Sequence, residues 1–172
     1  MREKVLILDT SILCIWLKVP GKDTCGSGEN VLTHDIVSDK INKEIENNTT
    51  FIIPVSSIIE TGNHIAQSSG DRYNVAKKLV DIIHKSADAE SPWATFTQQS
   101  SLWTSDALKL LANKWQETVV SGQSLGDASI VDVANYYHNL GRDVEIYTGD
   151  GGLKAYEPQH HDDIMVPRRR SR

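Results

Sequence analysis

Short apolar runs that alternate with helical patterns constrain this chain more than any other feature of its sequence. The runs VLIL, FII and VEIY occupy residues 5–8, 51–53 and 144–147. Apolar residues at helical spacing follow or separate them, at 31–47, 73–84, 107–120 and 128–140. Strands this short and this apolar, each followed by a helix, are typical of a buried parallel sheet. We therefore expect an α/β fold: a three-layer α/β/α sandwich around a mainly parallel sheet.

Length and charge add few restrictions. The 172 residues, 39% of them hydrophobic, predict one domain, over residues 1–166, and a basic C-terminal tail at 167–172. The formal net charge is −5, and without the four arginines of the tail 14 basic residues face 23 acidic ones, a charge of −9. Such an acidic body predicts weak non-specific affinity for nucleic acid. No apolar stretch approaches the ~18 residues of a membrane span, so a cytoplasmic protein is expected.

Four acidic residues stand where the expected elements begin or end. Asp9 follows the first strand and Asp150 follows the last, in VEIYTGD. Glu60 comes shortly after the strand FII, and Asp127 begins the pattern of a helix after SLG. Ligand sites of such sheets lie beyond the carboxyl ends of the strands. Four carboxylates at that edge would repel one another, and Mg²⁺ or Mn²⁺ among them is the economical explanation.

Each acid also has a purely structural interpretation. Asp9 and Asp127 could be helix N-caps, and Asp150 could be a turn residue. Glu60 could complete a capping box with Ser57, since Ser56 or Ser57 is the expected N-cap of its helix. All four together favour a metal site.

The motifs around these acids resemble those of the PIN-domain ribonucleases. The matching segments are LILDTSIL, IPVSSIIETGNHI, SLGDASIVDVAN and IYTGDGGLKAY, in the order in which the family carries them. They extend over residues 4–156.

The resemblance implies a metal-dependent endoribonuclease that hydrolyses RNA phosphodiester bonds. Asp9, Glu60, Asp127 and Asp150 would hold one or two Mg²⁺ or Mn²⁺ ions, and Thr10 and Thr148 would orient the carboxylates. Toxin members of the family are held inactive by a small antitoxin protein and often form homodimers, so a toxin–antitoxin or defence role and both kinds of partner are implied expectations.

Two segments depart from the compact toxin-type members. Residues 20–30 form a polar, Gly-rich loop that is long enough for a flap, and residues 86–104 have no clear period. The second segment carries Trp93, Phe96 and Trp103, which either stack on unpaired bases or pack against the body.

Other polar residues are secondary candidates. His64 lies one helical turn after Glu60, and Lys154 is placed to meet a phosphate or to stay solvated. Asp132 should face away from the ions, because five helical residues turn by roughly 140°. HHDD at 160–163 is interpreted as a solvated stretch rather than a metal site.

Two rival functions remain. LILDTS and GDASIVD resemble motifs of haloacid-dehalogenase-like phosphatases, but Ser11 stands where that family carries its second acid, and Glu60 and Asp150 would be unexplained. A non-catalytic PIN-like scaffold for RNA processing is the second rival, and the presence of all four acids favours activity over it.

Overall fold

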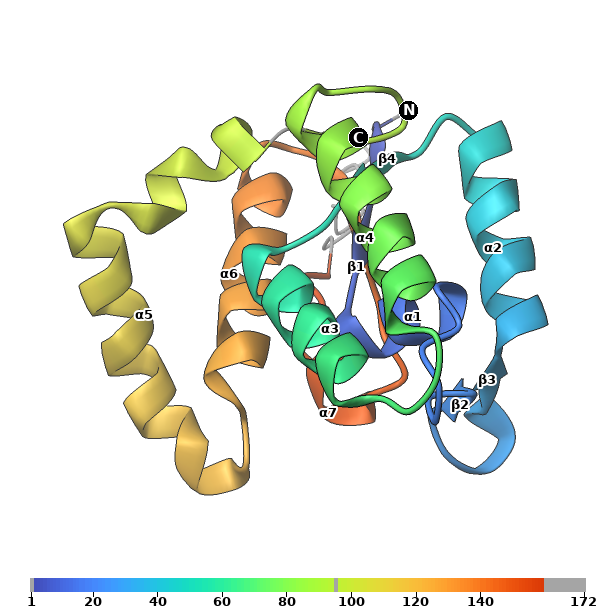
Figure 1. Cartoon of the computed structure of the whole chain (residues 1–172). Coiled ribbons are helices and arrows are strands. Elements are labelled where there is room, and N and C mark those ends of the chain that lie inside the picture. Colours follow the sequence, from blue (N-terminus) through green and yellow to red (C-terminus); the bar gives the residue numbers. More distant parts are fainter. Residues whose placement is uncertain (1, 95, 160–172) are drawn as a thin grey trace, which may run out of the picture.

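The computed structural model of this chain describes residues 2–94 and 96–159. It is an α/β protein with a three-stranded parallel sheet of order β4-β1-β5 (Figure 1). The strands are β1 (Lys4–Leu8), β4 (Thr50–Ile52) and β5 (Asp143–Tyr147), which confirms the three predicted strands. Ile7 of the central strand pairs with Ile52 on one side and Ile146 on the other.

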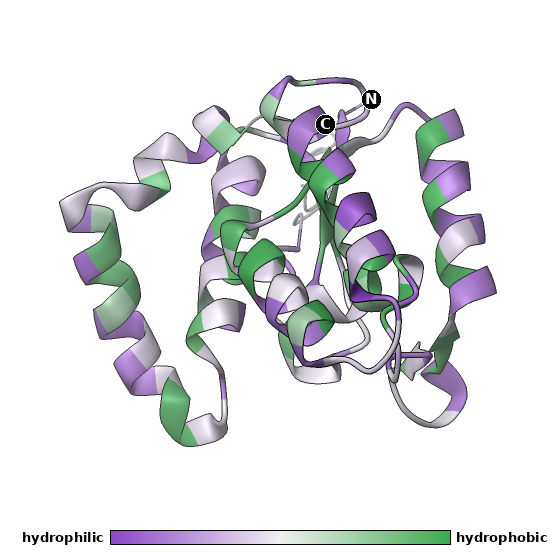
Figure 2. Ribbon diagram, in the orientation of Figure 1, coloured by the Kyte–Doolittle hydropathy of each residue, from purple (hydrophilic) through white to green (hydrophobic). Residues whose placement is uncertain are grey.

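The sheet is covered by apolar residues on both faces. Because side chains alternate along a strand, Leu6 and Leu8 enter one cluster and Val5 and Ile7 the other. The first cluster includes residues of α1 (Thr10–Trp16), α2 (His34–Glu46), α3 (Val55–Gln67) and α4 (Arg72–Ala87). The second joins residues of all three strands to residues of α6 (Leu125–Asn139) and to Leu153 of α7 (Gly151–Lys154). In Figure 2 the sheet and the helix sides that face it are correspondingly green.

Two helices begin earlier than the sequence predicts. Helix α3 starts directly after Pro54, which is its N-cap residue, so the predicted cap at Ser56 or Ser57 is wrong. Proline suits a helix start because its φ is already helical and it has no N–H to leave unpaired. Helix α6 starts at Leu125 rather than at residue 128, because the Ser124 side chain caps it.

The polar loop at 20–30 is partly ordered as a small hairpin. Strands β2 (Thr24–Cys25) and β3 (Leu32–Thr33) pair antiparallel, and the 3₁₀ turn η1 (Gly28–Asn30) lies between them. The hairpin leads directly into α2, whose N-cap is Thr33.

The segment without clear period extends the sheet edge and buries one tryptophan. The backbone N–H of Phe51 donates to Pro92 and that of Ala94 donates to Phe51. Trp93 is 8% exposed, and its ring meets Phe51 edge-on at 5.4 Å and Trp16 at 6.2 Å. Packing against the body, rather than base stacking, is therefore the role of Trp93.

The rest of that segment leads from the sheet edge to the peripheral helix α5. Residues after 95 form the 3₁₀ helix η2 (Phe96–Trp103), then α5 (Ser105–Thr118) and the turn η3 (Val119–Ser121). Helix α5 packs on α6 and stands at the side of the molecule (Figure 1). None of the helices in the described ranges is long and apolar enough to cross a membrane. The HHDD stretch at 160–163 and the tail at 167–172 lie outside the described residues.

Candidate active site

The carboxyl ends of β1 and β5 bring Asp9 and Asp150 to one edge of the sheet. Asp9 is the N-cap of α1, as its structural interpretation predicted, and it is 6% exposed. Its Oδ2 accepts hydrogen bonds from the hydroxyls of Ser11 at 2.7 Å and Thr148 at 2.8 Å. The Thr148 hydroxyl in turn accepts from the backbone N–H of Asp150 at 2.9 Å. Thr148 thus links the two acids.

Asp150 is held by the short helix that follows it. Its Oδ1 accepts from the backbone N–H groups of Gly152 at 2.7 Å and Leu153 at 3.3 Å, so Asp150 caps α7. The side chain is exposed.

Helix α3 brings Glu60 to the same edge. The hydroxyl of Thr10, the residue after Asp9, donates to Glu60 Oε2 at 3.0 Å. The capping box predicted as an alternative for Glu60 is not formed, because Ser57 is inside the helix and buried. Both threonines that we expected to orient carboxylates therefore donate to one of them: Thr10 to Glu60 and Thr148 to Asp9.

Gly126 lets Glu60 approach the start of α6. A Cβ atom at residue 126 would lie only 2.3 Å from Glu60 Oε1. The carboxylate of Glu60 consequently occupies the space of a missing side chain directly beside Asp127.

Asp127 takes part in the cap of α6. Its Oδ2 accepts from the backbone N–H of Ser124 at 3.2 Å, while the Ser124 hydroxyl accepts from the backbone N–H of Asp127 at 3.0 Å. Asp127 is therefore the third helical residue of a capping box, rather than the N-cap itself. Together with Asp150 and Tyr156 it lines a hollow of about 420 Å³.

All four acids are held in the same manner. Among the hydrogen bonds of the described residues, those to Asp9 and Asp127 go to Oδ2, those to Glu60 go to Oε2 and those to Asp150 go to Oδ1. Among the described residues, no hydrogen bond reaches the second oxygen of any of these carboxylates, and that of Glu60 lies against Gly126. Within the described ranges, no three His, Cys, Asp or Glu side chains already form a metal-ligand cluster. The acids are instead connected in pairs, through Thr148, Gly126 and the shared hollow.

Carboxylate oxygens with hydrogen-bonded partners suit hard divalent cations. Mg²⁺ binds through one or two carboxylates and keeps several waters, and a ligating carboxylate is commonly oriented by a second hydrogen bond. The four carboxylates therefore have the donor chemistry that the expected ion prefers, although among the described residues no three of them converge on one point.

The secondary candidates occupy other positions. Asp132 forms an ion pair with Lys114 at 3.3 Å, on the side of α6 that faces α5. Lys154 donates to the Ile146 carbonyl at 3.0 Å and pairs with Glu157 at 2.5 Å, so its ammonium group is already held by the protein. His64 is half-buried on α3.

Three contributors to the site were not predicted from the sequence: Gly126, Cys25, and Ser11 as a partner of Asp9. Ser11 donates to Asp9 and accepts from the backbone N–H of Gly149 at 3.1 Å, so it fixes the loop after β5. Cys25 of the hairpin also packs on this loop, since a Cβ at residue 149 would lie 2.3 Å from its Sγ. Burial raises the pKa of the Cys25 thiol, although a hydrogen bond with Ser11 opposes the rise. The hairpin thus covers one side of the candidate site.

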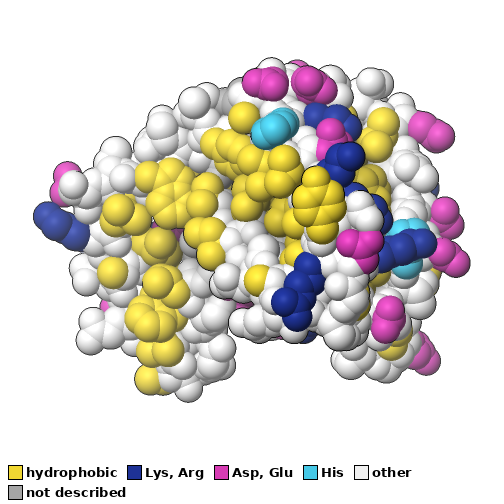
Figure 3. Space-filling view, viewed as in Figure 1, with side chains coloured by type: hydrophobic (Ala, Val, Ile, Leu, Met, Phe, Trp, Pro, Cys, Tyr) yellow, Lys and Arg dark blue, Asp and Glu magenta, His cyan; other side chains and the backbone are white. Residues whose placement is uncertain are grey.

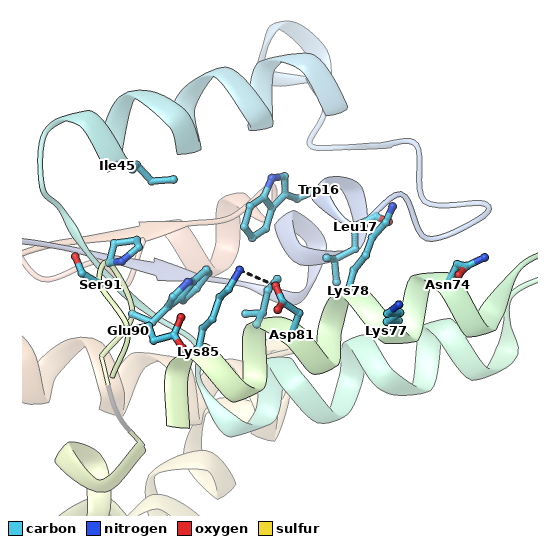
Figure 4. Close-up of a pocket in the computed structure, with 13 residues that line it drawn as sticks. Trp16, Leu17, Ile45, Asn74, Lys77, Lys78, Asp81, Lys85, Glu90 and Ser91 are labelled. Carbon is cyan, nitrogen blue, oxygen red and sulfur yellow. Dashed lines mark hydrogen bonds and ion pairs between the residues drawn. The ribbon is translucent and has the colours of Figure 1, made fainter. Parts of the chain in front are cut away.

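A larger hollow lies away from the four acids. It measures about 890 Å³ and is lined by α1, α4, Ile45 at the end of α2 and residues 90–93 (Figure 4). Trp16 reaches into it, and Lys85 pairs with Asp81 at 2.7 Å along its α4 side. None of the four acids lines it.

Charged side chains are unevenly distributed on the face that contains α3 and α4. In Figure 3 the Lys and Arg side chains of this face lie mostly toward α4 and α2, whereas apolar side chains are gathered over its centre and over α5. The exposed apolar side chains of α5 include Leu108 and Leu110. No broad positive surface covers this face, in line with the acidic composition.

Comparison with known proteins gives no relative. No protein-family model, no curated protein and no solved structure matches this chain.

Proposed function

We propose that the chain is a PIN-type, metal-dependent endoribonuclease whose centre is formed by Asp9, Glu60, Asp127 and Asp150. In this proposal the fold is the three-layer α/β/α sandwich expected from the sequence, and the apolar clusters on both faces of the sheet support it. The observation that carries the proposal is the common arrangement of the four acids. In each acid the hydrogen bonds among the described residues go to one oxygen, and the second oxygen of Glu60 lies against Gly126 at the start of α6.

The residues of the site would divide the work of binding and orientation. Asp9, Glu60, Asp127 and Asp150 would hold the cation, and the threonine partners of Asp9 and Glu60 would orient those two carboxylates. A divalent ion bound there would polarise the RNA phosphodiester and lower the pKa of a nearby water. Thr148, Thr10 and Ser11 would keep the carboxylates aligned, because each hydroxyl is itself anchored to a strand end or helix start.

The proposal is tested with the purified full chain and end-labelled single-stranded and structured RNAs. We expect cleavage with Mg²⁺ or Mn²⁺, and loss of cleavage with EDTA or in Asp9→Asn. Asp132→Asn is the matched control, because it removes a carboxylate from the same group of helices but one that pairs with Lys114.

Two outcomes would contradict the proposal. Equal RNA cleavage by wild type, Asp9→Asn and Asp127→Asn in metal-replete buffer would remove the acids from the mechanism. Rapid metal-dependent hydrolysis of p-nitrophenyl phosphate, without RNA cleavage, would favour a phosphatase.

A further inference from the structure

The hollow beside Asp127 and Asp150 has the size and chemistry of a site for one nucleobase. Its volume, about 420 Å³, lies in the range of roughly 300–1,000 Å³ that small-molecule sites occupy. It is lined from two sides, by the loop at 121–123 with the start of α6, and by α7 with the residues that follow it. Two of the four proposed metal acids form part of its wall, so a group bound here lies next to the reacting phosphate.

Tyr156 provides an aromatic surface in this hollow. Its backbone N–H donates to the Leu153 carbonyl at 3.1 Å, and Leu153 is buried in the core, so the position of the residue is fixed. The side chain nevertheless remains 43% exposed. A partly exposed ring whose backbone is held beside the core is suited to stacking on a planar base, because every base has a π-face.

The side chains that line the hollow suit a base better than a phosphate. The charged residues that line the hollow are Asp127 and Asp150, and the described residues contribute no Lys or Arg to its wall. A phosphate bound there would have to pair with the cation that these acids are proposed to hold, whereas an uncharged base needs no cationic partner. Gln123, whose side-chain amide offers both donors and an acceptor, also lines the hollow and can meet the polar edge of a base.

We propose that this hollow binds one unpaired base of a single-stranded RNA, stacked on Tyr156, next to the cleaved bond. The inference rests on the proposed nuclease function and adds a base-binding position to its site, which a base inside a duplex is not free to enter.

The first experiment measures binding directly. The dissociation constant of a short, fluorescein-labelled single-stranded RNA is determined by fluorescence anisotropy, with Ca²⁺ in place of Mg²⁺ and with the RNA checked for integrity on a gel. Loss of one stacked base predicts a roughly 5- to 150-fold higher dissociation constant for Tyr156→Ala. Tyr156→Phe keeps the ring and should bind as wild type does. Tyr73→Ala, which removes a 78% exposed tyrosine on α4, is the matched control and should also leave binding unchanged.

The second experiment starts from the wild-type protein and changes the RNA. A series of RNAs that each lack one base is bound to the wild-type protein, and we expect one position at which the missing base costs a similar factor. At that position Tyr156→Ala should show no additional loss, because the base and the ring contribute only together.

The outcomes separate the inference from the proposed function. The inference is overturned if the wild type binds no single-stranded RNA, if Tyr156→Ala binds as tightly as wild type, or if no missing base weakens binding. If instead Tyr156-dependent binding is found without metal-dependent cleavage, the nuclease proposal fails while the base site stands.

Discussion

Replacing Gly126 by alanine tests whether the position of the Glu60 carboxylate matters. The new Cβ would lie 2.3 Å from Glu60 Oε1 and 3.3 Å from its Cδ, whereas an ordinary contact begins near 3.4 Å. The carboxylate must therefore move by about 1 Å. Because it is the end of a flexible side chain, this movement costs the fold little.

The expected effect is a large loss of activity without a loss of stability. A misplacement of about 1 Å in a catalytic group can cost on the order of 100-fold in rate, which corresponds to about 2.7 kcal/mol in kcat/KM. Alanine in place of a helical glycine stabilises by roughly 0.5–1 kcal/mol, so the free energy of unfolding should stay level or rise slightly. The measurements are kcat/KM for RNA cleavage with Mg²⁺ and urea denaturation of the same preparation.

Gly62→Ala is the matched control for this variant. Gly62 lies in the interior of α3, two residues after Glu60, and a Cβ there meets no atom within 4 Å. It should gain similar stability and keep full activity. The reasoning is refuted if Gly126→Ala cleaves RNA at the wild-type rate, or if Gly62→Ala loses as much activity as Gly126→Ala.

Three further changes probe the site, an ion pair and the core. Thr148→Val removes the hydroxyl that donates to the buried Asp9 carboxylate, so urea denaturation should show a loss of about 1.5–3 kcal/mol and RNA cleavage should fall, with Thr148→Ser unaffected. Burial tends to raise the pKa of Glu145, but hydrogen bonds from lysines of α2 and β1 hold it below its ordinary 4.5. The stabilising contribution of Glu145 is complete above pH 4.5 and is lost as the pH falls through its lower folded-state pKa. In Glu145→Gln the free energy of unfolding should therefore fall less steeply below pH 4.5 than in the wild type. An unchanged fall would show that this carboxyl does not cause it. Trp93→Ala should lower the free energy of unfolding by roughly 3–5 kcal/mol, whereas a loss below 1 kcal/mol would contradict the burial of its ring against Phe51.

The sheet was predictable because its strands have a strong local signal. Each is an apolar run that ends at a polar residue or proline, and the run is short enough to exclude a helix. The start of α3 differs from the prediction for a local reason as well, since Ser56 and Ser57 are common N-cap residues, while the proline before them begins the helix.

The site was predictable as a set of acids but not as a set of contacts. The positions of Asp9 and Asp150 follow from the ends of parallel strands. The hydrogen bond from Thr10 to Glu60 joins residues 50 apart in the sequence, and nothing local to either residue specifies it. The role of Gly126 is equally non-local. From the helix sequence alone a glycine only lowers helix propensity, and the reason for it appears in the fold, where Glu60 occupies the place of a side chain.

The central place of β1 has a consequence for the order in which this protein can be made. Of the three strands of this sheet, β1 is synthesised first and lies between β4 and β5, and the hydrogen bond from Thr148 to Asp9 joins residues 139 apart. Because the N-terminal part of a chain leaves the ribosome first, Asp9 and Glu60 emerge before β5 can pair with β1. A nascent or truncated chain that lacks β5 has neither the complete sheet nor Asp150. The proposed nuclease would therefore remain inert until β5 and Asp150 have been synthesised, so a nascent chain without them would not cut RNA on the ribosome that carries it.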